Sequence, residues 1–113
     1  MGLEVVHFVR RFHMAIGVAD VAATIVDYSK RLGCEPAVIV EGQYAMWQTA
    51  TLNFSIRLDP VAPGTLRHIG WEDPAVNEVS MERDINGLQW ERFSAELQLA
   101  EIRSIWPISS ISS

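Results

Sequence analysis

A predicted strand that carries a histidine and leads into a helix cap occurs twice in this chain. The first copy reads HMAIGVAD from His13, and the second reads HIGWEDP from His68, 55 positions later. A repeat of this kind predicts two related structural units. Because 113 residues are about one domain's worth, we expect a single domain, with a first module at about residues 11–60 and a second at about residues 65–113.

The first copy has the pattern of a strand followed by an amphipathic helix. Bulky and small side chains alternate over residues 12–19, which is the period of a strand. Asp20 is a typical N-cap residue, residues 21–32 place apolar side chains at helical spacing, and Gly33 supplies a C-terminal stop. The first module is therefore predicted to begin with a strand whose bulky face is covered by the following helix.

The rest of the chain predicts further strands and a second helix. The predicted strands are residues 37–40, 44–49, 51–58, 66–71 and 88–93. Asp73 and Pro74 are typical of a helix cap and first turn, so residues 75–85 are predicted to be helical and to end at Asn86-Gly87. The C-terminal part is atypical for a second copy of the first module, and residues 94–106 fit a helix.

Composition and charge exclude several classes of protein. With 49% hydrophobic and 20% charged residues, the chain has an ordinary globular composition. Its net charge of -5 argues against nucleic-acid partners and anionic membranes. We find no apolar run long enough for a transmembrane helix and no signal peptide, so we expect a cytoplasmic protein. The single cysteine, Cys34, excludes an intramolecular disulfide.

The two repeated histidines are the strongest candidates for chemistry. His13 shares its strand face with Ala15 and Gly17, and His68 shares its face with Gly70. The bulky opposite faces are expected to be covered by the helices. Small side chains beside a histidine leave volume for a ligand. If the two strands pair about a pseudo-twofold axis, the two imidazoles converge in one hollow.

The strand and helix of the first module resemble those of a known family. The segment FHMAIGVADVAATIVDYSKRLGCEP, followed by YAMW, LNFSI and LRHIGWEDP, is similar to the vicinal oxygen chelate superfamily of glyoxalase I, extradiol dioxygenases, and fosfomycin and bleomycin resistance proteins. The resemblance covers about residues 11–87. It implies an α+β fold of paired βαβββ modules whose mixed sheet curls into a cup. Because only 26 residues follow Gly87, the second module is expected to be incomplete or rearranged.

The metalloenzymes of that superfamily carry a histidine on the first strand of each module, where His13 and His68 stand here. The resemblance therefore implies one divalent metal, Zn, Mn, Ni or Fe, completed by an acid from a later strand. Glu91 is the acid we select, with Glu96 and Glu101 as further candidates, although a glutamate on such a strand is commonly solvated. Both histidines can equally be cavity residues that bond carbonyl groups or an organic molecule, and the two interpretations stay open.

The polar face of the predicted strand at residues 51–58 supplies candidates for ligand binding. Asn53, Ser55 and Arg57 alternate along it, where some metalloenzymes of the superfamily place an acid. Amide and hydroxyl groups bind divalent metals poorly, whereas Arg57 can pair with an anionic ligand. Trp47 can stack on a flat ligand. These four residues are our predicted ligand-binding set.

The lack of an acid on that strand favours a function without a metal. We therefore expect a small-molecule binding protein of the glyoxalase and bleomycin-resistance type, with its ligand in a sheet-lined cavity. The alternative is a metal-dependent lyase, isomerase or dioxygenase that uses His13 and His68 as metal ligands. Open sheet edges and the short second module also predict a homodimer.

Overall fold

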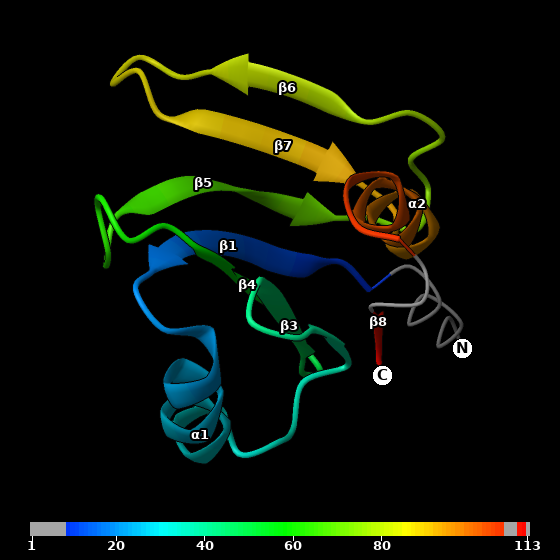
Figure 1. The fold of residues 1–113 in the computed structure, drawn as a ribbon. Coiled ribbons are helices and arrows are strands. Elements are labelled where there is room, and N and C mark those ends of the chain that lie inside the picture. The colour runs from blue at the N-terminus through cyan, green and yellow to red at the C-terminus, as the bar shows by residue number, and fades with distance from the viewer. Residues whose placement is uncertain (1–8, 108–110, 113) are drawn as a thin grey trace.

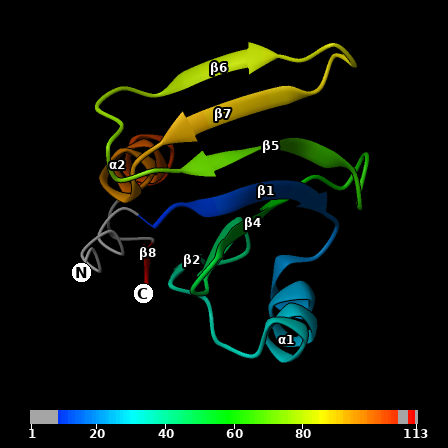
Figure 2. The same cartoon turned by 180° about the vertical axis from the view of Figure 1, so that it is seen from behind.

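The described residues form one curled mixed β-sheet with two helices, an α+β fold (Figures 1 and 2). The computed structural model describes residues 9–107 and 111–112. In chain order the elements are β1 (Arg11–Val18), α1 (Val21–Leu32), β2 (Val38–Val40), β3 (Tyr44–Gln48), β4 (Leu52–Leu58), β5 (Leu66–Glu72), β6 (Ser80–Arg83), β7 (Gln89–Phe93), α2 (Ala95–Ile105) and β8 (Ile111–Ser112). The strands are ordered β6-β7-β5-β1-β4-β3-β2-β8.

Two related half-sheets meet at the centre of this order. β1 pairs in parallel with β4 in the first half, and β5 pairs in parallel with β7 in the second. β1 and β5 then pair antiparallel and join the halves. The predicted repeat of strands is confirmed. Among the described residues, the second half-sheet consists of β5, β6 and β7, and no helix lies between them, so the expectation of an incomplete, rearranged second module is also confirmed.

Helix α1 has the limits that its capping residues predict. Asp20 is the N-cap, and its side chain accepts a hydrogen bond of 2.9 Å from the Ala23 backbone N–H. Gly33 ends the helix in the left-handed conformation, with φ 77°, which favours glycine. The predicted apolar stripe packs against one face of β1, β3 and β4. Trp47, with no exposed surface, lies in the core that results.

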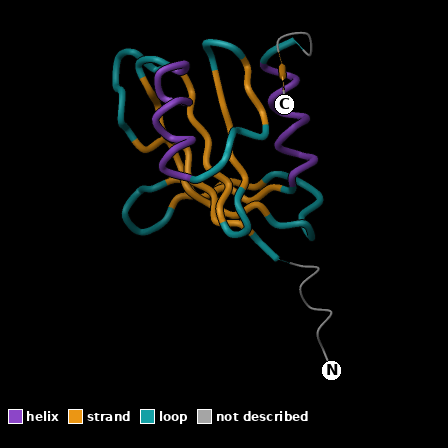
Figure 3. Tube along the Cα trace, turned by 90° about the horizontal axis from the view of Figure 1, so that it is seen from below, coloured by secondary structure: helices purple, strands orange, loops and turns teal. Residues whose placement is uncertain are grey.

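Helix α2 covers the opposite face of the first half-sheet. Alternate residues of β3 divide between the two cores: Ala45 and Trp47 pack towards α1, whereas Tyr44 and Met46 pack with Ile102 of α2. Figure 3 shows strands lying between the two helices. Residues 94–106, whose sequence fits a helix, contain α2, and Ser94 is its N-cap. Within the part of the chain that the structure describes, neither helix is long and apolar enough to cross a membrane.

The helix predicted at residues 75–85 is wrong. Asp73 caps only a local turn, in which its side chain accepts from the Ala75 N–H at 2.9 Å. Residues 80–83 form β6, which pairs antiparallel with β7. Asn86-Gly87 belongs to the hairpin turn between them, held by Asp84 Oδ1 through bonds from the backbone N–H groups of Asn86 and Leu88. Pairing with β7 therefore decides the structure of this segment, whose apolar stripe is weak.

No helix covers the outer face of β5 and β7 among the described residues, although the sequence predicted that one would. The bulky side chains there pack on one another instead. Phe12 lies edge-on to Trp71, with ring centroids 5.3 Å apart, and to Trp90 at 6.4 Å. The Arg10 guanidinium lies 4.4 Å from the Trp71 ring. This aromatic cluster keeps the outer face half-buried without a helix.

Candidate metal centre and its pocket

His13 and His68 converge because they occupy neighbouring strands and point to the same face. In the antiparallel register of β1 and β5, His13 lies opposite Gly70, and His68 lies opposite Ala15, so the two histidines are diagonal neighbours. His13 Nε2 lies 3.0 Å from His68 Nε2, and the ring centroids are 5.0 Å apart. The expected meeting of the two imidazoles is thus present in the structure.

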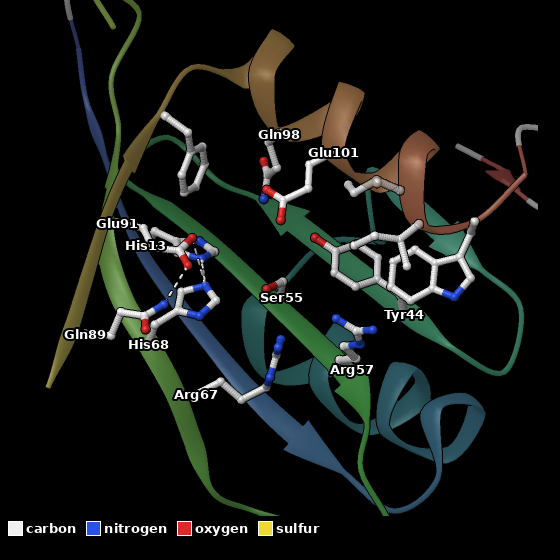
Figure 4. A pocket seen from close by; sticks show the side chains of 14 residues that line it. His13, Tyr44, Ser55, Arg57, Arg67, His68, Gln89, Glu91, Gln98 and Glu101 are labelled. Carbon is white, nitrogen blue, oxygen red and sulfur yellow. Dashed lines mark hydrogen bonds and ion pairs between the residues drawn. The ribbon is translucent and has the colours of Figure 1, made fainter. Parts of the chain in front are cut away.

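Glu91 joins the two histidines from β7. Its Oε1 lies 3.3 Å from His68 Nε2, and its Oε2 accepts a hydrogen bond of 3.0 Å from Gln89 Nε2 (Figure 4). The ligand atoms of His13, His68 and Glu91 all lie within 4.8 Å of one another, so this group could hold a metal ion. Among the three candidate acids, Glu91 is the one that the structure brings to the histidines. Glu96 is instead exposed in the first turn of α2.

Gly70 allows β7 to approach closely enough to deliver Glu91. A Cβ atom at Gly70 would overlap the Glu91 carbonyl oxygen and would lie 2.7 Å from the Glu91 backbone nitrogen. At Gly17, the corresponding space is filled by the Asp59 side chain, 2.8 Å away. The expectation that these glycines leave volume for a ligand is therefore wrong. At Gly70, the missing side chain makes room for the neighbouring strand.

Burial keeps both imidazoles neutral near pH 7. Burial lowers the pKa of His68 to about 4, and a smaller contribution comes from the charge that His13 would carry if protonated. The pKa of His13 is also lowered, again mainly by burial. Burial raises the pKa of Glu91, and the negative charge of Glu101 adds a smaller contribution in the same direction. Two neutral imidazoles beside a carboxylate offer three lone-pair donors to a cation.

The lowered pKa of His68 predicts that the metal-free protein loses stability in mild acid. Below about pH 6.5 the unfolded chain protonates this histidine, whereas the folded protein resists until about pH 4. The unfolded state then binds more protons, so the free energy of unfolding falls with pH, by up to about 1.4 kcal/mol per pH unit. Urea unfolding measured from about pH 7 down to pH 5 checks this. His68→Gln removes the group and should flatten the dependence; parallel curves for the two proteins contradict the prediction.

A pocket opens beside the three residues, between the sheet and α2. Its volume is about 360 Å³. Ser55, Arg57 and Arg67 lie on its sheet side, and Tyr44 and Glu101 lie towards α2 (Figure 4). Burial raises the pKa of Tyr44 to about 12, so its phenol keeps its proton and can donate a hydrogen bond. The pocket therefore combines a possible cation site with two arginines and a phenolic donor.

The predicted ligand-binding set is divided by the structure. Ser55 and Arg57 line the pocket. Trp47 lies on the other face of the sheet under α1, where its Nε1 donates to Ser29 Oγ at 3.2 Å, so its assignment as a ligand contact is wrong. Asn53 is also fully buried and lies behind His13, so its assignment to direct ligand contact is wrong too. Its polar atoms are used within the protein.

Arg67 and Tyr44 are pocket residues that the sequence did not reveal. Alternation along residues 66–71 places Arg67 on the face opposite His68. The pairing of β5 with β1 instead shifts register next to Ala15, where Ile16 pairs with Leu66. This irregularity turns Arg67 into the pocket, as bulges commonly re-aim a side chain (Figure 4). No local sequence pattern marks it. Tyr44 could have been predicted, because it lies directly opposite Arg57 in the pairing of β3 with β4 and therefore shares its face of the sheet.

Comparisons with known proteins add no family. No protein-family model matches this sequence, and a search of the curated proteins returns no match. The assignment of function therefore depends on the geometry of the pocket and its three candidate ligands.

Proposed function

We propose that this protein binds a divalent transition metal through His13, His68 and Glu91 and uses it to act on a small oxygenated anion. The observation that carries the proposal is the convergence of three ligand atoms within 4.8 Å at the wall of a pocket. Two imidazoles and one carboxylate are typical of Fe(II), Mn, Ni or Zn sites with open coordination positions. A bound ion at this wall would act as a Lewis acid on a substrate that chelates it.

One of the ligand-atom distances, that between the two histidines, matches the spacing of neighbouring ligands in an octahedron. Two nitrogens about 2.1 Å from one ion lie about 3.0 Å apart when they are at right angles and about 3.4 Å apart in a tetrahedron. The separation between His13 Nε2 and His68 Nε2 is 3.0 Å. An octahedral ion with three protein ligands keeps three positions for substrate and water.

The two arginines support an anionic substrate. Arg57 and Arg67 both line the pocket, and Figure 4 shows both side chains directed into it near Ser55. The Arg57 guanidinium lies 5.1 Å from the Trp106 ring, which helps to hold it in place. Arginine pairs well with carboxylate and phosphonate groups. The substrate class that fits is a molecule with two adjacent oxygens at one end and a carboxylate at the other.

Two 2-oxo acids test this assignment as a matched pair. Pyruvate and 2-oxoglutarate share the chelating end, but only 2-oxoglutarate carries a distal carboxylate. Titration calorimetry on the Mn²⁺-loaded protein should show tighter binding of 2-oxoglutarate. Arg57→Gln and Arg67→Gln should weaken that binding by about 10–100-fold, the loss expected for one charge-assisted bond, and leave pyruvate nearly unchanged. Equal affinities for the two acids in the wild-type protein contradict the anionic substrate class.

A metal-free binding protein is the second candidate, because one wall of the pocket is apolar. The rings of Tyr44 and Trp106 are in contact, with centroids 5.2 Å apart and planes tilted by 37°, and Ile102 and Ile105 also line this part of the pocket. Such a wall suits an aromatic or aliphatic ligand without any metal. The calorimetry distinguishes the two functions, because a metal-free binder holds its ligand equally well after chelator treatment, whereas the metal-dependent function is lost.

A further inference from the structure

Behind His13, on the side away from the pocket, buried polar groups form a chain that ends on an ion pair. Arg11 Nη1 lies 2.7 Å from Glu72 Oε2. Asn53 Nδ2 donates to Glu72 Oε1 at 2.8 Å, and Asn53 Oδ1 lies 3.0 Å from His13 Nδ1. Asn53 and Glu72 are 0% and 4% exposed, so water does not compete for these bonds. The chain connects a half-exposed arginine to a candidate metal ligand.

The ion pair determines which group donates and which accepts at each hydrogen bond of this series. A carboxylate only accepts hydrogen bonds, and Glu72 receives three donors, from Arg11, from Gln48 Nε2 at 2.9 Å and from Asn53. Asn53 must therefore present its NH₂ group to Glu72 and its oxygen to His13. Gln98 bonds both ends of the Asn53 amide, at 2.8 and 3.2 Å, and would allow both amides to be inverted together. Glu72 excludes the inverted orientation of the Asn53 amide, because a carboxylate cannot donate a hydrogen bond to the Asn53 oxygen.

This order of donors and acceptors fixes the tautomer of His13. Its Nδ1 faces two acceptors, Asn53 Oδ1 at 3.0 Å and the Asn53 main-chain oxygen at 3.1 Å. Nδ1 must therefore carry the proton of the neutral ring. Nε2 then presents a lone pair to the pocket, as a metal ligand must.

His68 holds its proton differently. In the described residues, no hydrogen bond is formed by His68 Nδ1, and its Nε2 contacts both His13 Nε2 and Glu91 Oε1. The 3.0 Å contact between the two Nε2 atoms needs one proton, and His13 Nε2 carries none. That proton is therefore on His68. An ion would replace this proton between the two nitrogens with little movement of either ring.

We propose that Arg11, Glu72 and Asn53 are positioning residues that lock His13 in its metal-binding tautomer, whereas His68 must change tautomer when the ion binds. On binding, the His68 Nε2 proton leaves to water, and Nδ1 takes up one proton from water, so the ring remains neutral. The proposal builds on the proposed metal site. The tautomer of His13 can nevertheless be measured in the metal-free protein, which separates the two ideas.

Glu72→Gln tests whether Glu72 sets the orientation of the Asn53 amide and the tautomer of His13. The glutamine amide at this position can donate to an inverted Asn53 amide. The Asn53 NH₂ group would then face His13 Nδ1 and compete with the main-chain oxygen, so that part of the molecules carry the proton on Nε2. Long-range proton–nitrogen NMR correlations of the metal-free protein should show one His13 tautomer, protonated at Nδ1, in the wild type and a mixture in the variant. The affinity for Mn²⁺ should fall by about 10–100-fold, as for other residues that orient metal ligands. Glu96→Gln makes the same change of charge on the exposed surface and should alter neither reading.

Arg11→Gln keeps the test decisive if Glu72→Gln does not fold. Without Arg11, no donor holds Glu72 Oε2, so the carboxylate can turn away from Asn53 and free the Asn53 amide to invert. The same tautomer mixture is expected. A wild-type His13 protonated at Nε2, or an unchanged His13 spectrum in a folded variant, overturns the proposal. A mixed tautomer in a protein whose wild type binds no metal upholds the positioning role and refutes the proposed function instead.

Discussion

His68→Ala is expected to abolish stoichiometric metal binding while leaving the fold intact. The substitution removes one of three converging ligand atoms and leaves His13 and Glu91 to hold the ion alone. Loss of a direct ligand should exceed the 10–100-fold loss typical of residues that only orient one, so we expect the affinity for Mn²⁺ or Fe²⁺ to fall by more than about 100-fold. The measurement is elemental analysis of protein prepared without a histidine tag, loaded and then dialysed.

His7, the histidine outside the candidate centre, and Glu101, a second acid of the pocket, provide matched controls. His7→Ala removes the one remaining imidazole, which lies outside the described residues, and Glu101→Gln removes an acid of the same pocket that is not among the three candidate ligands. Both variants should keep one ion per chain, whereas Glu91→Gln should lose it. If His68→Ala retains a full equivalent of metal, or if His7→Ala loses it, the candidate centre is in the wrong place.

The first half of the fold was predictable because its local patterns agree with its tertiary contacts. Asp20 and Gly33 mark the ends of α1 in the sequence, and the structure places both caps there. The alternation along residues 12–19 separates the face that packs on α1 from the face that carries His13. Since His13 and His68 share their faces with small residues in both copies of the repeat, their meeting followed from the pairing of two similar strands.

The second half was less predictable because long-range pairing determines it. Residues 80–83 are a strand only because β7 lies beside them, and Arg67 reaches the pocket only because β5 shifts its register against β1. The polar alternation of β7 put Gln89 and Glu91 on one face, but the sequence did not say which face lines the pocket. Trp47 was assigned to a ligand for the same reason, since either face of β3 is apolar enough to be core.

Gly70→Ala is expected to destabilise the protein and to disable the metal site together. The new Cβ would overlap the carbonyl group of Glu91, so β7 must move away from β5 or the backbone must distort. Overpacking a core commonly lowers the free energy of unfolding by about 1–3 kcal/mol. Main-chain atoms cannot rotate away from the new methyl group, so we expect a loss of about 3 kcal/mol or more here. Because Glu91 is carried on the displaced strand, its carboxylate should also withdraw from His68, and urea unfolding and metal analysis should both report the loss.

Gly64→Ala separates this clash from the ordinary cost of replacing a glycine. Gly64 has φ 81° and nothing within 4 Å of an added Cβ, so its substitution strains the backbone without touching a neighbour. That strain costs about 1–2 kcal/mol and should leave metal binding unchanged. If Gly70→Ala is no more destabilising than Gly64→Ala and still binds metal at full stoichiometry, close approach of β7 is not what positions Glu91. If Gly70→Ala loses both stability and metal, the lack of a side chain at Gly70 is what allows β7 to bring Glu91 within reach of the two histidines.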